Sequence, residues 1–309
     1  MGSPRGLWRG VADSELEIID LKYPHHSIIN RFDRYHRGGE IATKKSMKIL
    51  KLFGAALFAA ILSVGLTSCS EGDGLGGNGS KKLVKVTVSS GKNSQALTLS
   101  YDKKGHLTSA YLGDVCRYEW SGDTIVETED DESIIFTLVN GLIVNGKDDD
   151  SKVKFGYNAS KQLTSITETD NDSNSSETKT ISWEGDKVSK MVREDEYRRS
   201  ELTFTYEAQT CKGYNPILAS HIYGDTFLAW AHPELFGARA NQLVTKIVQT
   251  ETAKMQGTVT YDEVYEFTYT LDNKGYITSC SMKNETTEKM SGGQSDHWET
   301  SYTYSFTWK

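Results

Sequence analysis

Tyr101-Asp-Lys-Lys-Gly-His-Leu-Thr-Ser-Ala110 contains the pattern that decides the fold of this chain of 309 residues. An aromatic strand end is followed by a polar turn, and an apolar-Thr-Ser segment then starts a return strand. The same order recurs in Tyr157-Asn-Ala-Ser-Lys-Gln-Leu-Thr-Ser-Ile166 and in Thr270-Leu-Asp-Asn-Lys-Gly-Tyr-Ile-Thr-Ser279. Polar turns between short β-rich runs are typical of hairpins, so each repeat predicts one β-hairpin.

The sequence around these repeats alternates between apolar and polar side chains with a period of two. Val84-Lys85-Val86-Thr87-Val88 shows the alternation, which returns at 96–101, 152–157, 180–183, 201–206 and 265–269. This period predicts antiparallel strands with one wet face. We therefore expect residues 81–309 to form a single all-β domain, a large antiparallel meander sheet.

One segment departs from the β pattern. Residues 225–241, DTFLAWAHPELFGARAN, have a mostly helical apolar spacing that is interrupted at Pro233, which predicts a short helical insertion. A strongly bent sheet needs its concave apolar face covered, so the insertion is expected to cover a half-barrel. Phe227, Trp230 and Phe236 are predicted either to plug the trough or to form a movable lid over a lipid or glycan site.

A lipoprotein signal peptide precedes the β-rich region. Residues 47–68 begin with a basic segment and continue with an uncharged apolar run, and Leu66-Thr67-Ser68-Cys69 resembles a bacterial lipobox. The apolar run is too short to span a bilayer comfortably, which is typical of a cleaved signal. Cys69 is therefore predicted to carry the lipid that anchors the protein to a membrane.

The flanking segments support this interpretation. Residues 1–46 show no sustained apolar period and are interpreted as a disordered upstream extension translated from a misplaced start. Residues 69–80 combine the lipidated Cys with a Gly-rich flexible tether. Glu71 and Asp73 resemble the signal that exports Bacteroidetes lipoproteins to the cell surface. We expect an outer-membrane lipoprotein, with the cell surface favoured over a periplasm-facing position.

The charge balance bears on possible partners. The chain has 35 Lys and Arg against 42 Asp and Glu, a formal net charge of −7, and the part that follows the signal peptide is more acidic still. An anionic protein repels phosphate backbones, so no nucleic acid partner is expected. The predicted contact with the membrane is the lipid on Cys69, and the protein is expected to be a monomer.

The chain resembles the DUF4595 family of Bacteroidetes lipoproteins over about residues 81–309. The likeness rests on the lipobox, on hairpins that also resemble the YD repeats of secreted bacterial proteins, and on Asn215-Pro216. It continues through the helical insertion to Asn241-Gln-Leu-Val-Thr-Lys-Ile247. The resemblance implies a porin-like fold and a cell-envelope location, and it implies no activity.

Residues that could carry chemistry are few. His106, His221, His232 and His297 show no metal-ligand spacing with one another or with a Cys, and His221 is expected on a strand. The sequence contains no nucleophile elbow and no Gly-rich phosphate loop. We therefore predict no catalytic residue, no metal and no cofactor.

Several smaller features leave alternatives open. The acidic runs 127–132, 148–150 and 170–174 are either calcium loops or acidic hairpin tips. Thr124, in Asp123-Thr124-Ile125, resembles an O-glycosylation acceptor at a turn. The remaining cysteines allow one disulfide at most, with Cys211 and Cys280 as a guess. Alternating aromatic residues in the last strand suggest either core packing or a sugar-stacking platform.

The sequence leaves two main classes of function open, and a third is a purely structural role as an assembly partner in an outer-membrane complex, which predicts an uncovered sheet edge. The first is a non-catalytic envelope protein that binds a glycan, a lipid or a partner protein, which predicts an apolar trough or an exposed aromatic strip. The second is a carboxylate-dependent hydrolase of envelope or dietary glycans, which predicts two acids facing each other in a cleft, one with a raised pKa. The sequence favours the first class.

Overall fold

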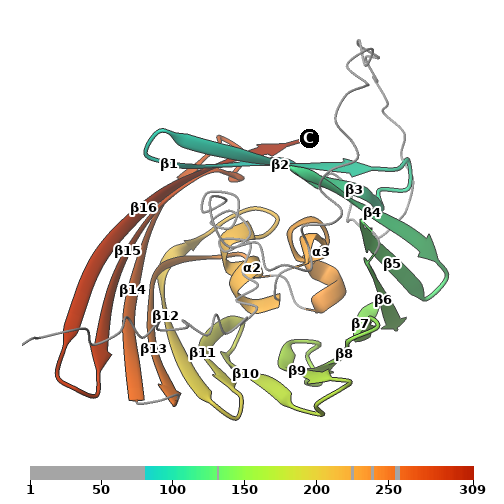
Figure 1. Ribbon diagram of the computed structural model, residues 1–309. Helices are drawn as coiled ribbons and strands as arrows, with labels where there is room; N and C mark the ends of the chain where they lie inside the picture. Colours follow the sequence, from blue (N-terminus) through green and yellow to red (C-terminus); the bar gives the residue numbers. More distant parts are fainter. Residues whose placement is uncertain (1–80, 131, 224–225, 238–239, 255–257) are drawn as a thin grey trace, which may run out of the picture.

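The computed structural model describes residues 81–130, 132–223, 226–237, 240–254 and 258–309, whose strands form one closed antiparallel barrel (Figure 1). Each strand pairs with its neighbours along the chain. Their bounds are β1 (Leu83–Ser90), β2 (Asn93–Tyr101), β3 (Leu107–Leu112), β4 (Asp114–Ser121), β5 (Thr124–Glu129), β6 (Glu132–Val139), β7 (Leu142–Lys147), β8 (Ser151–Tyr157), β9 (Leu163–Asp170), β10 (Ser176–Glu184), β11 (Lys187–Glu194), β12 (Arg198–Thr210), β13 (Gln242–Lys254), β14 (Thr258–Leu271), β15 (Ile277–Met290) and β16 (Ser295–Trp308). The predicted all-β antiparallel meander is confirmed.

The barrel is closed, whereas the sequence analysis predicted a half-barrel. β1 and β16 pair antiparallel, with Val86 opposite Phe306. Beyond the strands, the Lys82 N–H donates to the Lys309 carbonyl at 2.6 Å, and the Lys309 N–H donates back at 2.9 Å. Closure removes unpaired sheet edges. The half-barrel prediction was wrong because pairing of the first and last strands depends on the curvature of the whole sheet, which no local pattern encodes.

The three repeated hairpins make the same three hydrogen bonds. An Asx side chain in each turn accepts the backbone N–H four residues later at 2.9 or 3.0 Å, in Asp102, Asn158 and Asp272. The threonine of each return strand donates to a carbonyl at 3.1 Å, in Thr108, Thr164 and Thr278. An indole N–H donates to the first carbonyl of each return strand at 2.6 or 2.8 Å, in Trp120, Trp183 and Trp308. The repeat therefore fixes both the turn and the strand register.

The two ends of the barrel differ. The repeat turns, Lys82, Lys309 and the connection between β12 and β13 lie at one end, which we call the plug end. The opposite end, which we call the open end, is formed by the hairpins that join β1 to β2, β3 to β4 and so on to β15 and β16. β12 and β13 have 13 residues and β14 to β16 have 14, against 6 for β3. The wall therefore extends farther on the β12–β16 side.

The connection between β12 and β13 is helical and lies inside the ring of strands (Figure 1). It consists of α2 (Pro216–Tyr223), α3 (Phe227–Ala231) and the 3-10 helix η2 (Pro233–Phe236). α2 begins at Pro216 because Asn215 Oδ1 accepts the N–H of Ile217 at 3.1 Å, and proline suits the first helical position. The helical part thus starts before residue 225, and His221 lies in a helix. The strand prediction for His221 was wrong because a short apolar run does not distinguish a buried strand from a buried helix.

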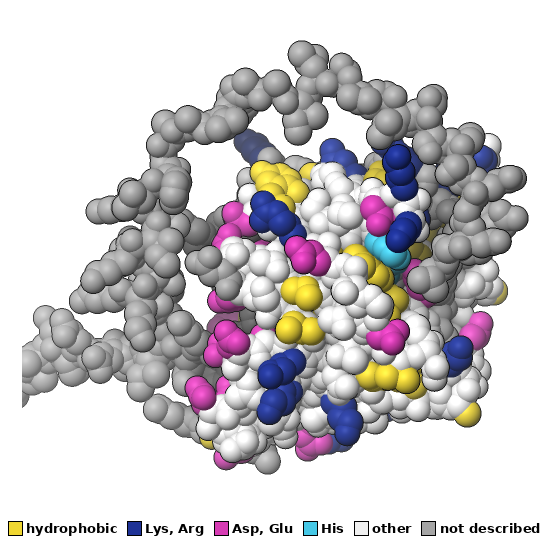
Figure 2. All heavy atoms as spheres, turned by 90° about the vertical axis from the view of Figure 1, so that its right-hand side faces the viewer, with side chains coloured by type: hydrophobic (Ala, Val, Ile, Leu, Met, Phe, Trp, Pro, Cys, Tyr) yellow, Lys and Arg dark blue, Asp and Glu magenta, His cyan; other side chains and the backbone are white. Residues whose placement is uncertain are grey.

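The outer face of the wall is polar. Ion pairs join neighbouring strands there, such as Lys190 with Glu201 and Lys289 with Asp262, each at 2.6 Å. Figure 2 shows acidic and basic side chains interspersed on one face, with small apolar groups between them. Mixed charges of this kind are typical of a surface in contact with water. Within the described ranges, no helix has the length and apolar character needed to cross a membrane.

Candidate functional site

The barrel interior is apolar at the plug end. Leu107 and Leu163 of the wall are fully buried, and the helices fill the space that the wall encloses. Phe227, Trp230 and Phe236, which the sequence suggested as a plug or a lid, are buried in this core, with Phe236 0 % exposed.

Aromatic and polar contacts join the helices to the wall. The Phe236 ring stacks on Tyr223, with ring centroids 5.6 Å apart, and meets Phe155 of β8 edge-on at 5.7 Å. Thr226, the N-cap of α3, donates its hydroxyl to the buried carboxylate of Glu127 on β5 at 2.6 Å. These contacts favour the plug over the lid.

Toward the open end the inward face becomes polar. We call the following inward side chains the open-end lining: Ser200, Glu251, Tyr261, Glu263, Tyr265, Asn284, Thr286, Glu288 and Trp298. Their direction follows from the register, because the pair Glu263 and Thr286 lies on the same face of the sheet as the buried pair Phe267 and Met282. The sequence analysis missed this site. The sequence feature that could have revealed it is Glu263. This glutamate lies between Tyr261 and Tyr265, at a position of the alternating strand pattern where side chains face the core.

Glu263 is the carboxylate that the lining holds most directly. Its Oε2 accepts the Tyr265 hydroxyl at 2.9 Å, and its Oε1 accepts the Thr286 hydroxyl at 3.3 Å. Asn284 Nδ2 donates in turn to Thr286 Oγ1 at 3.2 Å. Burial raises the pKa of Glu263, and the two hydroxyl donors oppose that rise. Glu263 forms no ion pair with the part of the chain that the structure describes, so no protein cation neutralises it there.

Glu251 lies on the same wall, on the strand next to Glu263, and is 9 % exposed. Burial raises the pKa of Glu251 and the Glu263 charge adds to the rise, whereas Arg198 and Arg193 lower it. Ser200 lies opposite Glu251 on β12 and is 3 % exposed. The Ser200 hydroxyl has no hydrogen-bond partner within the described ranges.

Two arginines flank the lining and are bound by other acids. Arg193 Nη2 lies 2.5 Å from Glu177 Oε2, and Arg198 Nε lies 3.3 Å from Asp195 Oδ2. Because each arginine already pairs with another acid, its charge is only partly available to neutralise Glu251 or Glu263.

The alternating aromatic residues of the last strand divide between core and open end. Tyr304, Phe306 and Trp308 are buried, as the core alternative predicts. Trp298, farther along the same inward face, is 40 % exposed at the open end. Trp298 thus presents an accessible ring on the same inward face, opposite Thr286.

Each of the four histidines named above has a partner in the fold. These partners are the Ile217 carbonyl for His221, the Trp120 ring for His106, the Leu107 N–H and Glu234 for His232, and the Thr287 hydroxyl for His297. Burial lowers the pKa of His221, whose ring faces Tyr265 edge-on at 6.2 Å. Across the described residues, no group of three His, Cys, Asp or Glu side chains could hold a metal ion.

The remaining candidates do not join the lining. Cys116, Cys211 and Cys280 are buried free thiols, so the guess that Cys211 pairs with Cys280 was wrong. Thr124 is the first residue of β5 and is half-buried. Its side chain points outward, because that of the next residue, Ile125, is buried on the inward face. Cys69, the signal peptide 47–68, the tether 69–80 and the extension 1–46 lie outside the described residues.

The acidic runs 148–150 and 170–174 lie at the open end, where they close hairpin turns, whereas Glu127 of the run 127–132 is buried and accepts a hydrogen bond from Thr226. Asp148 Oδ1 accepts two backbone N–H groups of its own turn at 2.5 and 2.9 Å. Asp170 Oδ1 does the same at 2.7 and 3.0 Å. These contacts fit the alternative of acidic hairpin tips.

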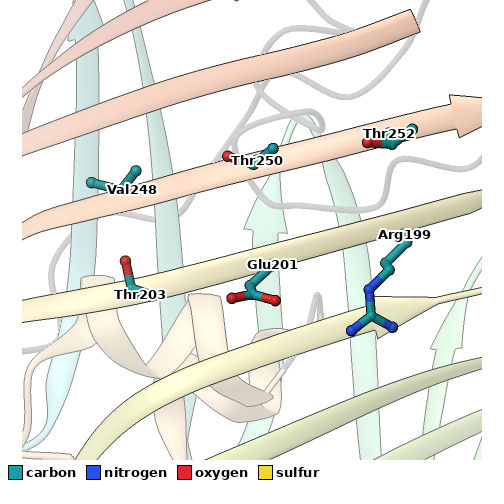
Figure 3. Close-up of a pocket in the computed structure, with 6 residues that line it drawn as sticks. All are labelled: Arg199, Glu201, Thr203, Val248, Thr250 and Thr252. Carbon is teal, nitrogen blue, oxygen red and sulfur yellow. The ribbon is translucent and has the colours of Figure 1, made fainter. Parts of the chain in front are cut away.

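A shallow groove lies on the outer face between β12 and β13 (Figure 3). Its lining consists of the cross-strand pairs Arg199 and Thr252, Glu201 and Thr250, and Thr203 and Val248. Arg199 is paired with Glu194 at 2.7 Å, and Glu201 is paired with Lys190 at 2.6 Å. Because both charges are already paired, the open-end lining is the stronger candidate site.

Comparison with known proteins identifies the architecture. Residues 116–279, more than half of the chain, match the sequence profile of a family described as a domain of unknown function (DUF4595) with porin-like fold. A porin-like protein from Bacteroides uniformis ATCC 8492 is similar in structure, with a TM-score of 0.57 and 18% sequence identity over 74% of this chain and 98% of that one. A porin-like protein from Bacteroides vulgatus ATCC 8482 has a TM-score of 0.51 and 12% identity over 74% of this chain and 99% of that one. No curated protein matches the sequence.

Proposed function

The chain belongs to the DUF4595 family of domains with a porin-like fold, and we propose that it is a non-catalytic cell-envelope lipoprotein that binds a glycan in the open end of its plugged barrel. The observation that carries this proposal is the change of the inward face from a filled apolar core to a polar lining with an exposed Trp298 ring and partly buried carboxylates.

The chemistry of the lining suits a sugar better than a lipid. Carboxylate and amide oxygens such as those of Glu263 and Asn284 accept hydrogen bonds from hydroxyl groups, and the Trp298 ring offers an apolar face for stacking. An acyl chain would need an open apolar cavity. At the plug end that space is filled by Trp230 and Phe236.

The position of Lys81, the first residue that the structure describes, favours an open end that faces away from the membrane. Lys81 lies at the plug end, where its ammonium group contacts Asp272 at 3.1 Å. A lipid on Cys69 would therefore join the barrel at the plug end through residues 70–80. A Gly-rich composition is typical of a tether, and attachment at the plug end would leave the lining accessible to glycans outside the cell.

Palmitate labelling of intact cells tests the anchor. We expect label on the wild type and none on Cys69→Ala, because the thiol of Cys69 is the proposed lipidation site. Digestion of the intact cells with a protease should remove the labelled protein if it lies on the cell surface. Label on the Cys69→Ala variant would refute the anchor, and full protection from the protease would place the labelled protein facing the periplasm.

A glycan array tests the binding site. We expect the purified protein to bind a subset of the glycans, and we expect Glu263→Gln and Trp298→Ala each to reduce that binding. Glu266→Gln is the matched control, because Glu266 lies on the same strand with its side chain exposed on the outer face. Binding that survives both lining variants but is lost in Arg199→Ala would move the site to the outer groove.

A carboxylate-dependent glycan hydrolase is the second candidate, and one observation favours it. Burial raises the pKa of both Glu251 and Glu263, which lie on neighbouring strands of the open-end lining. A raised carboxyl pKa is what a general acid requires. Incubation with the glycans that bind, followed by an assay for new reducing ends, distinguishes the two functions. Product formation that is lost in Glu263→Gln would establish the hydrolase and overturn the binding protein.

A further inference from the structure

We infer that the open end recognises a glycan that carries a free amino group, with Glu263 as the counter-ion of the ammonium. This inference rests on the proposed glycan function and names the class of sugar. Its grounds are the carboxylate without a protein cation, an unpartnered hydroxyl opposite Glu251 on the same inward face, and the charge of the surrounding hairpin tips.

Glu263 is a half-buried carboxylate that lacks a protein cation. Hydroxyl groups from Tyr265 and Thr286 hold its two oxygens, and no ion pair with a described residue neutralises it. Removing a carboxylate from water is unfavourable, which is why burial raises the pKa of Glu263, and an opposite charge that approaches the carboxylate offsets this cost. The neighbouring Arg193 and Arg198 are bound to other acids, so they do not fill this role. A cation carried by a ligand would provide the opposite charge for Glu263.

Ser200 provides an independent indication that the lining is incomplete on its own. Its hydroxyl is buried, faces inward opposite Glu251 and has no partner within the described ranges. The Oδ1 atom of Asn284, on the other side of Glu263, is also buried and unpartnered there. Buried polar atoms normally have partners. Groups on a ligand with several N–H and O–H donors could supply them.

The rim of the open end has the matching charge. In the described hairpin connections there, the acidic residues are Asp130, Asp148, Asp149, Asp150, Asp172, Asp195 and Glu196, and the basic residue is Lys92. An excess of negative charge around a mouth raises the local concentration of cations. Because no described group of three side chains could hold a metal ion, an organic cation fits the lining better. The Trp298 ring favours a sugar ring over a plain polyamine, and it can also attract a cation.

Isothermal titration with the full chain in detergent tests the inference at about pH 6.5, roughly two units above the ordinary pKa of a glutamate carboxyl, which leaves room for the raised pKa of Glu263. The probes are a glucosamine tetramer, its fully N-acetylated counterpart and spermidine. We expect the amine tetramer to bind at least about tenfold more tightly than the acetylated one, a preference that Glu263→Gln removes and Glu266→Gln retains. In the wild type, added NaCl should weaken the same preference, which needs no variant to fold.

The other outcomes separate the inference from the function on which it rests. Equal or tighter binding of the acetylated tetramer would leave the glycan function in place and overturn the ammonium inference. Spermidine binding as tight as that of the amine tetramer would overturn recognition of a sugar. An amine preference that persists in Glu263→Gln would overturn the role of Glu263.

Discussion

Replacement of Phe236 by alanine tests whether the helical insertion is a structural plug. Phe236 is fully buried in η2 and contacts the rings of Tyr223 and Phe155. Truncation of a buried phenylalanine costs about 3–5 kcal/mol in the free energy of unfolding. The range of about 3–5 kcal/mol already includes lost ring contacts, and two aromatic neighbours, each worth about 0.5–1.5 kcal/mol, place Phe236→Ala in its upper part, at about 4–5 kcal/mol.

Urea unfolding followed by far-UV circular dichroism measures this loss. A change of about 4 kcal/mol corresponds to roughly a thousandfold change in the unfolding constant, so the unfolding midpoint should fall clearly. Tyr111→Ala is the control, because Tyr111 is large, aromatic and exposed on β3, and its loss should change stability by no more than about 0.5 kcal/mol. A midpoint for Phe236→Ala that equals the wild type would refute the plug and revive the movable lid.

Three further predictions concern the repeats, the lining and the thiols. Trp183→Phe removes the indole hydrogen bond to the Leu163 carbonyl but keeps an aromatic ring, so it should lower the free energy of unfolding by about 0.5–1.5 kcal/mol. A loss of stability smaller than that of a substitution at an exposed position would contradict the contribution of this hydrogen bond. Burial raises the pKa of Glu263 in the folded state, so the stability that this carboxyl contributes is present below its ordinary pKa and is lost as the pH rises through the raised pKa; thermal unfolding from acid to neutral pH should show a smaller fall for Glu263→Gln than for Glu266→Gln. Alkylation in denaturant without reductant should label Cys116, Cys211 and Cys280, and a mass that retains a disulfide would contradict the free thiols.

Local patterns predicted the strands and the hairpins because their causes are local. The Asx turn, the Thr-Ser return strand and the period-two alternation each depend on residues close in sequence. The hydrogen bonds of Asp102 and Thr108, for example, join residues four and eight positions apart. Closure of the barrel depends on Leu83 and Trp308, which are distant in sequence and meet through the curvature of all the intervening strands. No turn or alternation encodes that meeting.

The site was harder to predict than the fold. Asn215 and Pro216 start α2, but the apolar residues that follow are equally compatible with a strand, so the position of His221 was misjudged. Glu263 looks like an ordinary exposed glutamate until the register places it on the inward face with Phe267. The available signal was a charged residue at a position of the alternating strand pattern where apolar side chains face the core.

A crystal structure of the protein with its best-binding glycan tests the central claim most directly. The account predicts the sugar in the open end of the barrel, stacked on Trp298 and hydrogen-bonded to Glu263, with the helical plug unchanged. A glycan bound in the outer groove beside Arg199 and Thr252, or seated in place of displaced Phe236, would contradict it.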